Sequence, residues 1–356
     1  MRPLEHRVLQ GLDGEVSALG AGCWTIGGPA TNNGVPIGWD DVDENGAYAG
    51  LVRAHELGVT LFDTADVYGM GHSERLLGRL LRSIDRSSVV VSSKVGYFAG
   101  TGPHPYHPAQ IHHQFTTTLR NLGTDYLDVY FLHSSDFGEE DRYLADAVEL
   151  LNGLRERGLV RAIGMRAPHT FAEQWAAGHG PIAAEAGRFL HLFRAIRPSV
   201  LSARYNLLSP CYAEDETDIF TFAHRRRVGV LIKQVLGQGL LLGCHHPDAP
   251  PTFSGDDHRT SDPRFGAESL GELWDLMAPI RARFGDSPAE LARVALRYAL
   301  QHAPDAAVLV GFRNADQIHT SITCLGEPLT PAEITEIRAA LYTKPNNHTE
   351  LEGHPI

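Results

Sequence analysis

Short runs of Val, Leu, Ile and Ala alternate along the chain with longer segments in which apolar positions recur at helical spacing. The strand-like runs are residues 16–24, 59–65, 88–94, 126–133, 159–165, 199–208, 228–236 and 306–311. The helix-like segments lie near residues 43–57, 73–84, 108–122, 142–157, 170–195, 216–226, 268–284, 288–303 and 314–323. Eight strand–helix units in one chain predict an α/β fold of the (β/α)8 TIM barrel class.

The strand-like runs are almost continuously apolar, which indicates strands that are buried on both faces by flanking helices. An open doubly wound sheet is the main alternative, and it would be expected to carry GxGxxG after its first strand. Residues 20–28 instead read GAGCWTIGG, which has the wrong spacing and no helix directly behind it. The closed barrel is therefore favoured.

Helix caps and loop composition add detail to the barrel. Ser287 and Thr330 each precede a proline and stand three residues before a glutamate, which predicts two capped helix starts. The second start opens an extra C-terminal helix after the eighth unit. Two long connecting loops, residues 27–41 and 245–263, are expected to act as lids or binding loops. We expect residues 1–356 to form one barrel domain.

Composition narrows the classes of partner. The 356 residues carry a formal charge of −12 and no basic tract, which argues against nucleic-acid binding and favours a small-molecule partner. No apolar run reaches the length of a membrane span and the N-terminus has no signal-like region, so we expect a cytoplasmic protein without membrane association. The four cysteines and nineteen histidines lack metal-ligand spacing, so neither a metal site nor a disulfide framework is expected.

Lysine is rare in this chain. Of 31 basic residues only three are lysine, namely Lys94, Lys233 and Lys344, so arginine supplies most of the positive charge. A lysine kept in such a chain suggests a position that needs a compact ammonium group. Lys94 ends the segment SSVVVSSK and Lys233 ends GVLIK, which predicts a charge at the end of each buried strand.

Four polar side chains fall at the carboxyl ends of three successive strand-like runs, where the working residues of such barrels gather. Asp63 and Tyr68 follow the second run, Lys94 closes the third and His133 closes the fourth, so we expect all four to face one cavity.

Proton chemistry suggests a role for each of these four groups. A tyrosine hydroxyl titrates near ~10, and we expect the adjacent Lys94 ammonium to lower the pKa of Tyr68. Asp63 would orient Lys94, and a neutral His133 would donate a hydrogen bond to a substrate oxygen. The implied reaction is carbonyl reduction or its reverse.

Each of these residues also has an ordinary structural explanation. Asp63 could cap the following turn, Tyr68 could be an aromatic residue at the barrel rim, and His133 could be a hydrogen-bonded core histidine. Because four complementary groups occur together at matching strand ends, the catalytic interpretation is favoured.

The segments GVTLFDTADVYGMGHSERLLGRLL (58–81), SSKVG (92–96) and TDYLDVYFLH (124–133) resemble the aldo-keto reductase family. The resemblance extends from LGAGCW (19–24) to the final helix. It implies a (β/α)8 barrel, a nicotinamide cofactor bound in an extended form without a Rossmann fold, and a catalytic tetrad in which Tyr68 is the general acid. Trp24, at the end of the first strand-like run, is a candidate substrate contact.

The cofactor has candidate contacts in two segments. In VLVGFRNADQIHTSI (308–322), a strand end and a helix start offer backbone N–H groups and the Arg313 guanidinium to a phosphate. The resemblance assigns Gly311, Arg313 and Gln317 to the adenosine phosphate end, which favours NADPH over NADH. It assigns a further group to a loop over the pyrophosphate: Leu236, Gly237 and Gly239. The alternative for Arg313 is an ion pair with a surface carboxylate.

The chain departs from the family pattern around the expected nicotinamide ring. Arg166 and Ala167 replace the usual Ser-Asn, Ser202 replaces a glutamine and Lys233 replaces an aromatic residue. Ser321 stands where asparagine is common. Arg166 and Lys233 would place two cations near the reacting centre, and buried cations need an anionic partner. That partner could be a carboxylate or phosphate on the substrate, the cofactor in an altered position, or a neighbouring acidic side chain.

The sequence therefore predicts an NADPH-dependent oxidoreductase that reduces an aldehyde or ketone, such as a sugar or a specialised metabolite. Two alternatives stay open. One is a redox-neutral epimerase on the same barrel with tightly held cofactor, and the other is a non-catalytic cofactor-binding subunit.

Overall fold

Eight parallel strands close into a barrel in the computed structural model, which describes residues 4–40, 42–98, 100–209 and 218–342. The closure is completed by β12, which pairs with both β11 and β3. The barrel strands are β3 (Leu19–Gly22), β6 (Leu61–Asp63), β7 (Val90–Val95), β8 (Leu127–Leu132), β9 (Val160–Ala167), β10 (Val200–Arg204), β11 (Gly229–Lys233) and β12 (Ala306–Gly311). The predicted (β/α)8 barrel is confirmed.

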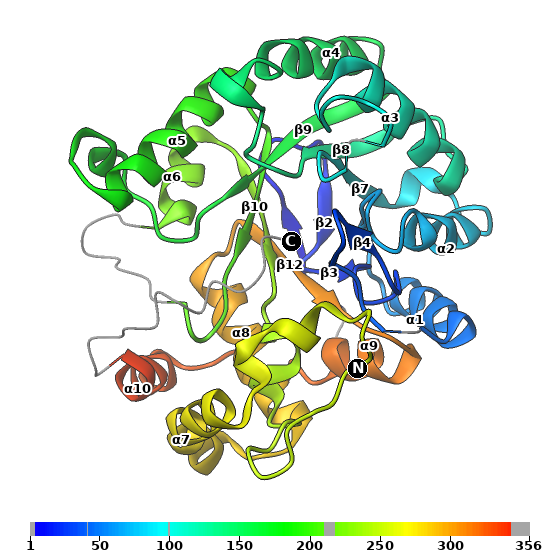
Figure 1. The fold of residues 1–356 in the computed structure, drawn as a ribbon. Helices are drawn as coiled ribbons and strands as arrows, with labels where there is room; N and C mark the ends of the chain where they lie inside the picture. The colour runs from blue at the N-terminus through cyan, green and yellow to red at the C-terminus, as the bar shows by residue number, and fades with distance from the viewer. Residues whose placement is uncertain (1–3, 41, 99, 210–217, 343–356) are drawn as a thin grey trace.

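Helices surround the strands in chain order, as Figure 1 shows. They are α1 (Glu44–Glu56), α2 (His72–Leu81), α3 (Pro108–Leu122), α4 (Leu144–Glu156), α5 (Pro181–Ile196), α6 (Ile219–Arg226), α7 (Ala267–Phe284), α8 (Pro288–His302), α9 (Ala315–Thr323) and α10 (Pro331–Tyr342). The extra C-terminal helix α10 packs against α7. Within the described ranges, no helix is long and apolar enough to cross a bilayer.

The two predicted helix caps are present. Glu290 N donates to Ser287 Oγ, and the Glu290 carboxylate accepts from Ser287 N, which completes a capping box at α8. At α10, Thr330 N donates to the Glu333 carboxylate at 2.7 Å, and Glu333 N donates to Thr330 Oγ1 at 3.2 Å. Local sequence therefore fixes both helix starts.

Two predicted elements have different forms in the structure. The run 16–24 is divided between β2 (Glu15–Ser17), which pairs with β1 (His6–Val8) in an antiparallel hairpin, and the barrel strand β3. Ser17 N donates to the Thr60 hydroxyl and not to a neighbouring strand, which interrupts the run. The predicted helix 170–195 is a 3-10 helix over Glu173–Ala177 followed by α5, which begins at Pro181 after two glycines.

The barrel interior has an apolar lower part and a polar upper part. The apolar cluster includes Leu61, Phe131, Val200 and Leu231, while the hairpin residue Leu9 packs into it from below. A Cβ atom on Gly164 would lie 2.3 Å from the Phe131 ring, so a glycine is needed beside that ring. Because side chains alternate along a strand, the next inward positions toward the carboxyl ends carry the polar residues predicted from the sequence.

The two long loops meet above the carboxyl ends of the strands. The first contains the short hairpin β4 (Thr31–Asn32) and β5 (Val35–Pro36), and Gly38 forms a bridge with Asp257 of the second loop. His258 N donates to Gly38 O at 3.0 Å, and Asp40 N donates to Asp257 Oδ2 at 2.9 Å. These contacts between distant segments form a cover over one side of the barrel mouth.

Candidate active site

Asp63 and Lys94 form a buried ion pair between neighbouring strands. Lys94 Nζ lies 2.6 Å from Asp63 Oδ2 and donates a second hydrogen bond to Thr64 O at 2.7 Å. Ser92 Oγ donates to the other carboxylate oxygen of Asp63 at 2.6 Å. Because both charges have good partners, this arrangement fixes the position of the ammonium group inside the barrel.

Tyr68 lies directly beside this ion pair. The Lys94 ammonium is 4.7 Å from the centroid of the Tyr68 ring. Burial raises the pKa of the Tyr68 hydroxyl well above its ordinary value, and the negative charge of Asp63 adds to this increase. The expectation that Lys94 lowers this pKa is wrong in direction, because desolvation prevails and the ammonium charge is compensated by Asp63. The hydroxyl therefore keeps its proton, the state that a proton donor requires.

His133 is buried between two tyrosine rings. Its ring centroid lies 4.5 Å from that of Tyr97 and 6.1 Å from that of Tyr68. Burial, followed by the charges of Lys94 and Lys233, lowers the pKa of His133 well below its ordinary value, so the ring is neutral. Neither ring nitrogen has a hydrogen-bond partner among the described residues. An unsatisfied buried donor costs about 1–3 kcal/mol, which makes this ring a candidate ligand contact.

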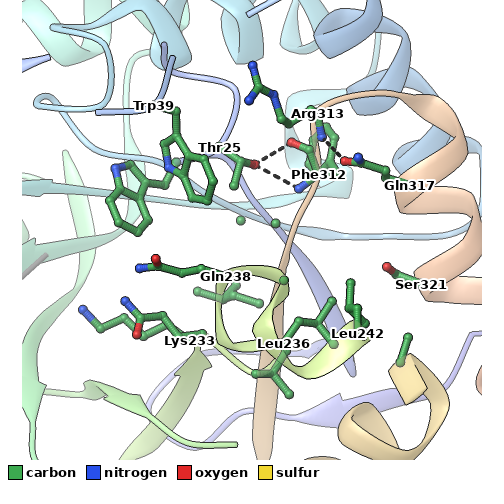
Figure 2. Close-up of a pocket in the computed structure, with 18 of the residues that line it drawn as sticks. Thr25, Trp39, Lys233, Leu236, Gln238, Leu242, Phe312, Arg313, Gln317 and Ser321 are labelled. Atoms are coloured by element: carbon green, nitrogen blue, oxygen red, sulfur yellow. Dashed lines mark hydrogen bonds between the residues drawn. The ribbon is translucent and has the colours of Figure 1, made fainter. Parts of the chain in front are cut away.

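A cavity of about 520 Å³ runs from this cluster to the start of α9 (Figure 2). The residues predicted from the sequence that line it are Trp24, Asp63, Tyr68, Lys233, Leu236, Gly239, Gly311, Arg313, Gln317 and Ser321. Five other predicted residues do not belong to its lining, namely Lys94, His133, Arg166, Ser202 and Gly237. The four proposed catalytic residues are therefore brought together, although two of them lie behind the cavity wall.

The far end of the cavity is built around the first turn of α9. Arg313 N donates to Gln317 Oε1 at 2.8 Å, while Thr25 Oγ1 donates to Phe312 O at 2.5 Å. The Arg313 guanidinium forms an ion pair with Asp40. The carboxylate pairing that the sequence left open for Arg313 is thus present, and Asp40 stands where a bound phosphate would compete with it.

The loop after β11 forms one wall of the cavity. Gly239 has φ +95°, a conformation that favours glycine, and Gln238 extends its side chain over the cavity. The Gln238 side chain is hydrogen-bonded to the His258 ring, 3.2 Å between Oε1 and Nε2. This contact links the loop predicted to cover a pyrophosphate to the loop cover described above.

The replaced positions lie on three adjacent strands. Arg166 is in register with Ser202 on β10, and Arg204 is in register with Lys233 on β11. Arg166 Nη1 donates to Tyr97 Oη at 3.0 Å. Burial and the nearby charge of Arg166 lower the pKa of Lys233 well below its ordinary value. Basic side chains therefore border the candidate reacting centre on this side of the barrel.

Trp24 is held beneath the loop cover. Its indole Nε1 donates to Ile37 O at 3.1 Å, and its ring centroid lies 4.5 Å from His258 and 5.3 Å from Trp39. The Trp24 and Tyr68 rings are 6.2 Å apart. An apolar wall suited to a small organic substrate therefore stands next to the candidate proton donor.

Several residues at the site are absent from the sequence-based predictions. They are Thr25, Trp39, Asp40, Tyr97 and Gln238. Residues 27–41 were identified as a binding loop, but the side chains that point inward depend on its pairing with residues around Asp257. That pairing leaves no local signal in either segment.

The model of the Aldo/keto reductase family matches residues 18–341. The NADH-specific methylglyoxal reductase of Escherichia coli is 26% identical over 338 residues, which cover 91% of this chain and 94% of that protein. The structure of the glycerol dehydrogenase AKR11B4 from Gluconobacter oxydans has a TM-score of 0.72 at 24% identity, covering 97% and 98% of the two chains.

An aldo/keto reductase from Klebsiella pneumoniae, solved in complex with NADP and acetate, has a TM-score of 0.63 at 22% identity, covering 96% of each chain. The match of the family model spans all eight barrel strands and the segments that carry the four clustered residues. This chain belongs to the aldo/keto reductase family of oxidoreductases.

Proposed function

We propose that this protein reduces an aldehyde or ketone with NADPH, and that Tyr68 supplies the proton. The observation that carries the proposal is the Lys94–Asp63 ion pair beside Tyr68, with the unsatisfied ring of His133 next to it. A bound nicotinamide cofactor would supply the hydride. The substrate would be a small carbonyl compound, such as a sugar or a specialised metabolite.

The roles of the four side chains follow from their geometry. The Tyr68 hydroxyl is protonated and would transfer its proton to the carbonyl oxygen as that oxygen gains negative charge. Lys94 lies close enough to stabilise the phenolate that remains, and Asp63 holds Lys94 in place. Neutral His133 would donate an N–H to the same oxygen. The phenolate then regains a proton from solvent.

The residues at the far end of the cavity fit the adenosine phosphate of NADPH. Arg313 offers a guanidinium group beside the N-terminus of α9, and Gln317 and Ser321 line the same wall. The ion pair between Arg313 and Asp40 would have to break for Arg313 to bind the phosphate. The names of the relatives point both ways, because one is NADH-specific and another was solved with NADP. We propose NADPH on the basis of Arg313. We also propose a cytoplasmic location, because a reducing compartment suits the free thiols of Cys23, Cys244 and Cys324.

The proposal is tested by following NADPH oxidation with a panel of aldehydes and ketones. The wild-type protein should oxidise NADPH only when a carbonyl compound is present, and Tyr68→Phe should lower kcat by about 10²–10⁴-fold, the usual contribution of a positioned proton donor. Tyr126 directly precedes β8, at the end of the strand opposite to the candidate site, so Tyr126→Phe serves as the matched control. Activity that is equal in Tyr68→Phe and Tyr126→Phe would contradict the proposal.

A further inference from the structure

Three adjacent strands end in basic side chains on one side of the barrel mouth. Arg166 belongs to β9, Arg204 to β10 and Lys233 to β11, and Lys233 stands two positions after Leu231 of the apolar cluster inside the barrel. Lys233 lines the cavity, and Arg166 is half-buried beside Tyr97. The charges of Arg166 and Lys233 both act on His133, so both lie near the candidate reacting centre.

The positive charge of Lys233 is not matched by an acidic side chain. Among the described residues, its ammonium group has no hydrogen-bond or ion-pair partner. The nearby carboxylate Asp63 is already engaged by Lys94 and Ser92. An ammonium removed from bulk water and placed near other cations is costly, and an anion bound at that point would compensate for both effects.

The two ends of the cofactor are poorly suited to supply this anion. Figure 2 shows Lys233 on the opposite side of the pocket from Gln317 and Ser321, where the proposed mode places the adenosine phosphate. The nicotinamide end of the proposed cofactor carries no negative charge in either redox state. The reduced ring is neutral and the oxidised ring is cationic. The other anion of the cofactor, the pyrophosphate, is expected on the loop that starts at Leu236, three residues after Lys233. An anion on the substrate is the second candidate, and measuring NADPH binding in a Lys233 variant separates the two.

We propose that the substrate is a carbonyl compound with a carboxylate or phosphate group, and that Arg166 and Lys233 bind this group. This inference rests on the proposed function and specifies its substrate class. Arg166 suits the task because its guanidinium is oriented by the hydrogen bond to Tyr97 and can bind two oxygen atoms in parallel. Lys233 provides a second, point-like charge from the cavity wall.

Matched substrate pairs test the inference. One pair is 4-carboxybenzaldehyde and methyl 4-formylbenzoate, and the other is glyceraldehyde 3-phosphate and glyceraldehyde, so the pairs separate carboxylate from phosphate recognition. In at least one pair, kcat/KM of the wild type should be at least about tenfold higher for the anionic compound than for its neutral counterpart. One hydrogen bond to a charged group contributes enough binding free energy for a tenfold difference. Lys233→Met and Arg166→Gln should each lower this ratio about tenfold or more, chiefly through KM.

The controls assign each outcome. Arg120→Gln removes an exposed positive charge on α3 and should leave both ratios unchanged. The inference is overturned if the wild type reduces both members of each pair equally well, or if Lys233→Met weakens NADPH binding tenfold without changing the ratio. Failure to reduce any of the four compounds or the wider panel, with NADPH bound, would instead refute the proposed function on which the inference rests.

Discussion

The cofactor preference can be tested at Arg313, because this residue separates the two cofactors by a single phosphate group. Arg313→Gln removes the guanidinium and leaves the backbone contact with Gln317 in place. The substitution should weaken NADPH binding and leave NADH binding nearly unchanged, since NADH has no phosphate at this position.

The structure sets the size of the effect. The side chains of Arg313 and Asp40 are 29% and 32% exposed, so their ion pair is worth only about 0.2–1 kcal/mol. A hydrogen bond to a charged phosphate contributes about 1.5–3 kcal/mol, which exceeds the ion pair that must be given up. The dissociation constant for NADPH should therefore increase roughly 10- to 100-fold in Arg313→Gln. Asp40→Asn removes the competing carboxylate and should tighten NADPH binding by up to about fivefold.

Fluorescence titration with NADPH and NADH measures both effects, because Trp39 and Trp24 lie at the pocket. Arg79→Gln is the matched control, since Arg79 also pairs with a carboxylate but lies outside this cavity. Equal loss of NADPH and NADH affinity in Arg313→Gln, or weaker NADPH binding in Asp40→Asn, would refute the assignment of this end of the cavity to a phosphate.

Four further substitutions probe stability. Lys94→Met leaves the Asp63 carboxylate buried without its partner and should lower the free energy of unfolding, measured by urea denaturation, by about 3–5 kcal/mol. The double variant Lys94→Met with Asp63→Asn should recover much of this loss. Burial raises the pKa of Asp66 to about 8, so the native state holds a proton that the unfolded state loses near pH 4. The free energy of unfolding should therefore fall by up to about 1.4 kcal/mol per pH unit between pH 4 and pH 8. Asp66→Asn should flatten that slope in urea midpoints measured at pH 5 and pH 8, and an unchanged slope would contradict the stated cause. Gly164→Ala forces a methyl group into the Phe131 ring and should lower stability by about 1–3 kcal/mol, with a clear fall in melting temperature.

The sequence was sufficient for the barrel because its strands are buried on both faces and therefore appear as apolar runs. The same runs end at Asp63, Lys94 and His133, and parallel strands bring their carboxyl ends together, so the cluster could be predicted without coordinates. The error over residues 16–24 has a local cause. The hairpin strand β2 and the barrel strand β3 are separated only by Ala18, and nothing in the local sequence indicates the contact of Ser17 with Thr60 that divides them.

The parts that could not be predicted depend on distant contacts. Arg313 and Asp40 are far apart in the sequence, and nothing around either residue indicates the pairing. The loop cover likewise depends on Gly38 meeting Asp257. The direction of the Tyr68 pKa shift was wrong because a sequence shows which charges are near but does not show how deeply the hydroxyl is buried.

The most direct test of the account follows hydride transfer from NADPH that carries deuterium at both C4 positions of the nicotinamide. With a reducible aldehyde, wild-type protein should place deuterium on the carbinol carbon of the product, one atom for each NADPH consumed. Tyr68→Phe should bind NADPH with wild-type affinity and transfer deuterium at least about 100-fold more slowly. Product without deuterium, or transfer by Tyr68→Phe at the wild-type rate, would contradict the claim that Tyr68 completes a carbonyl reduction in this barrel.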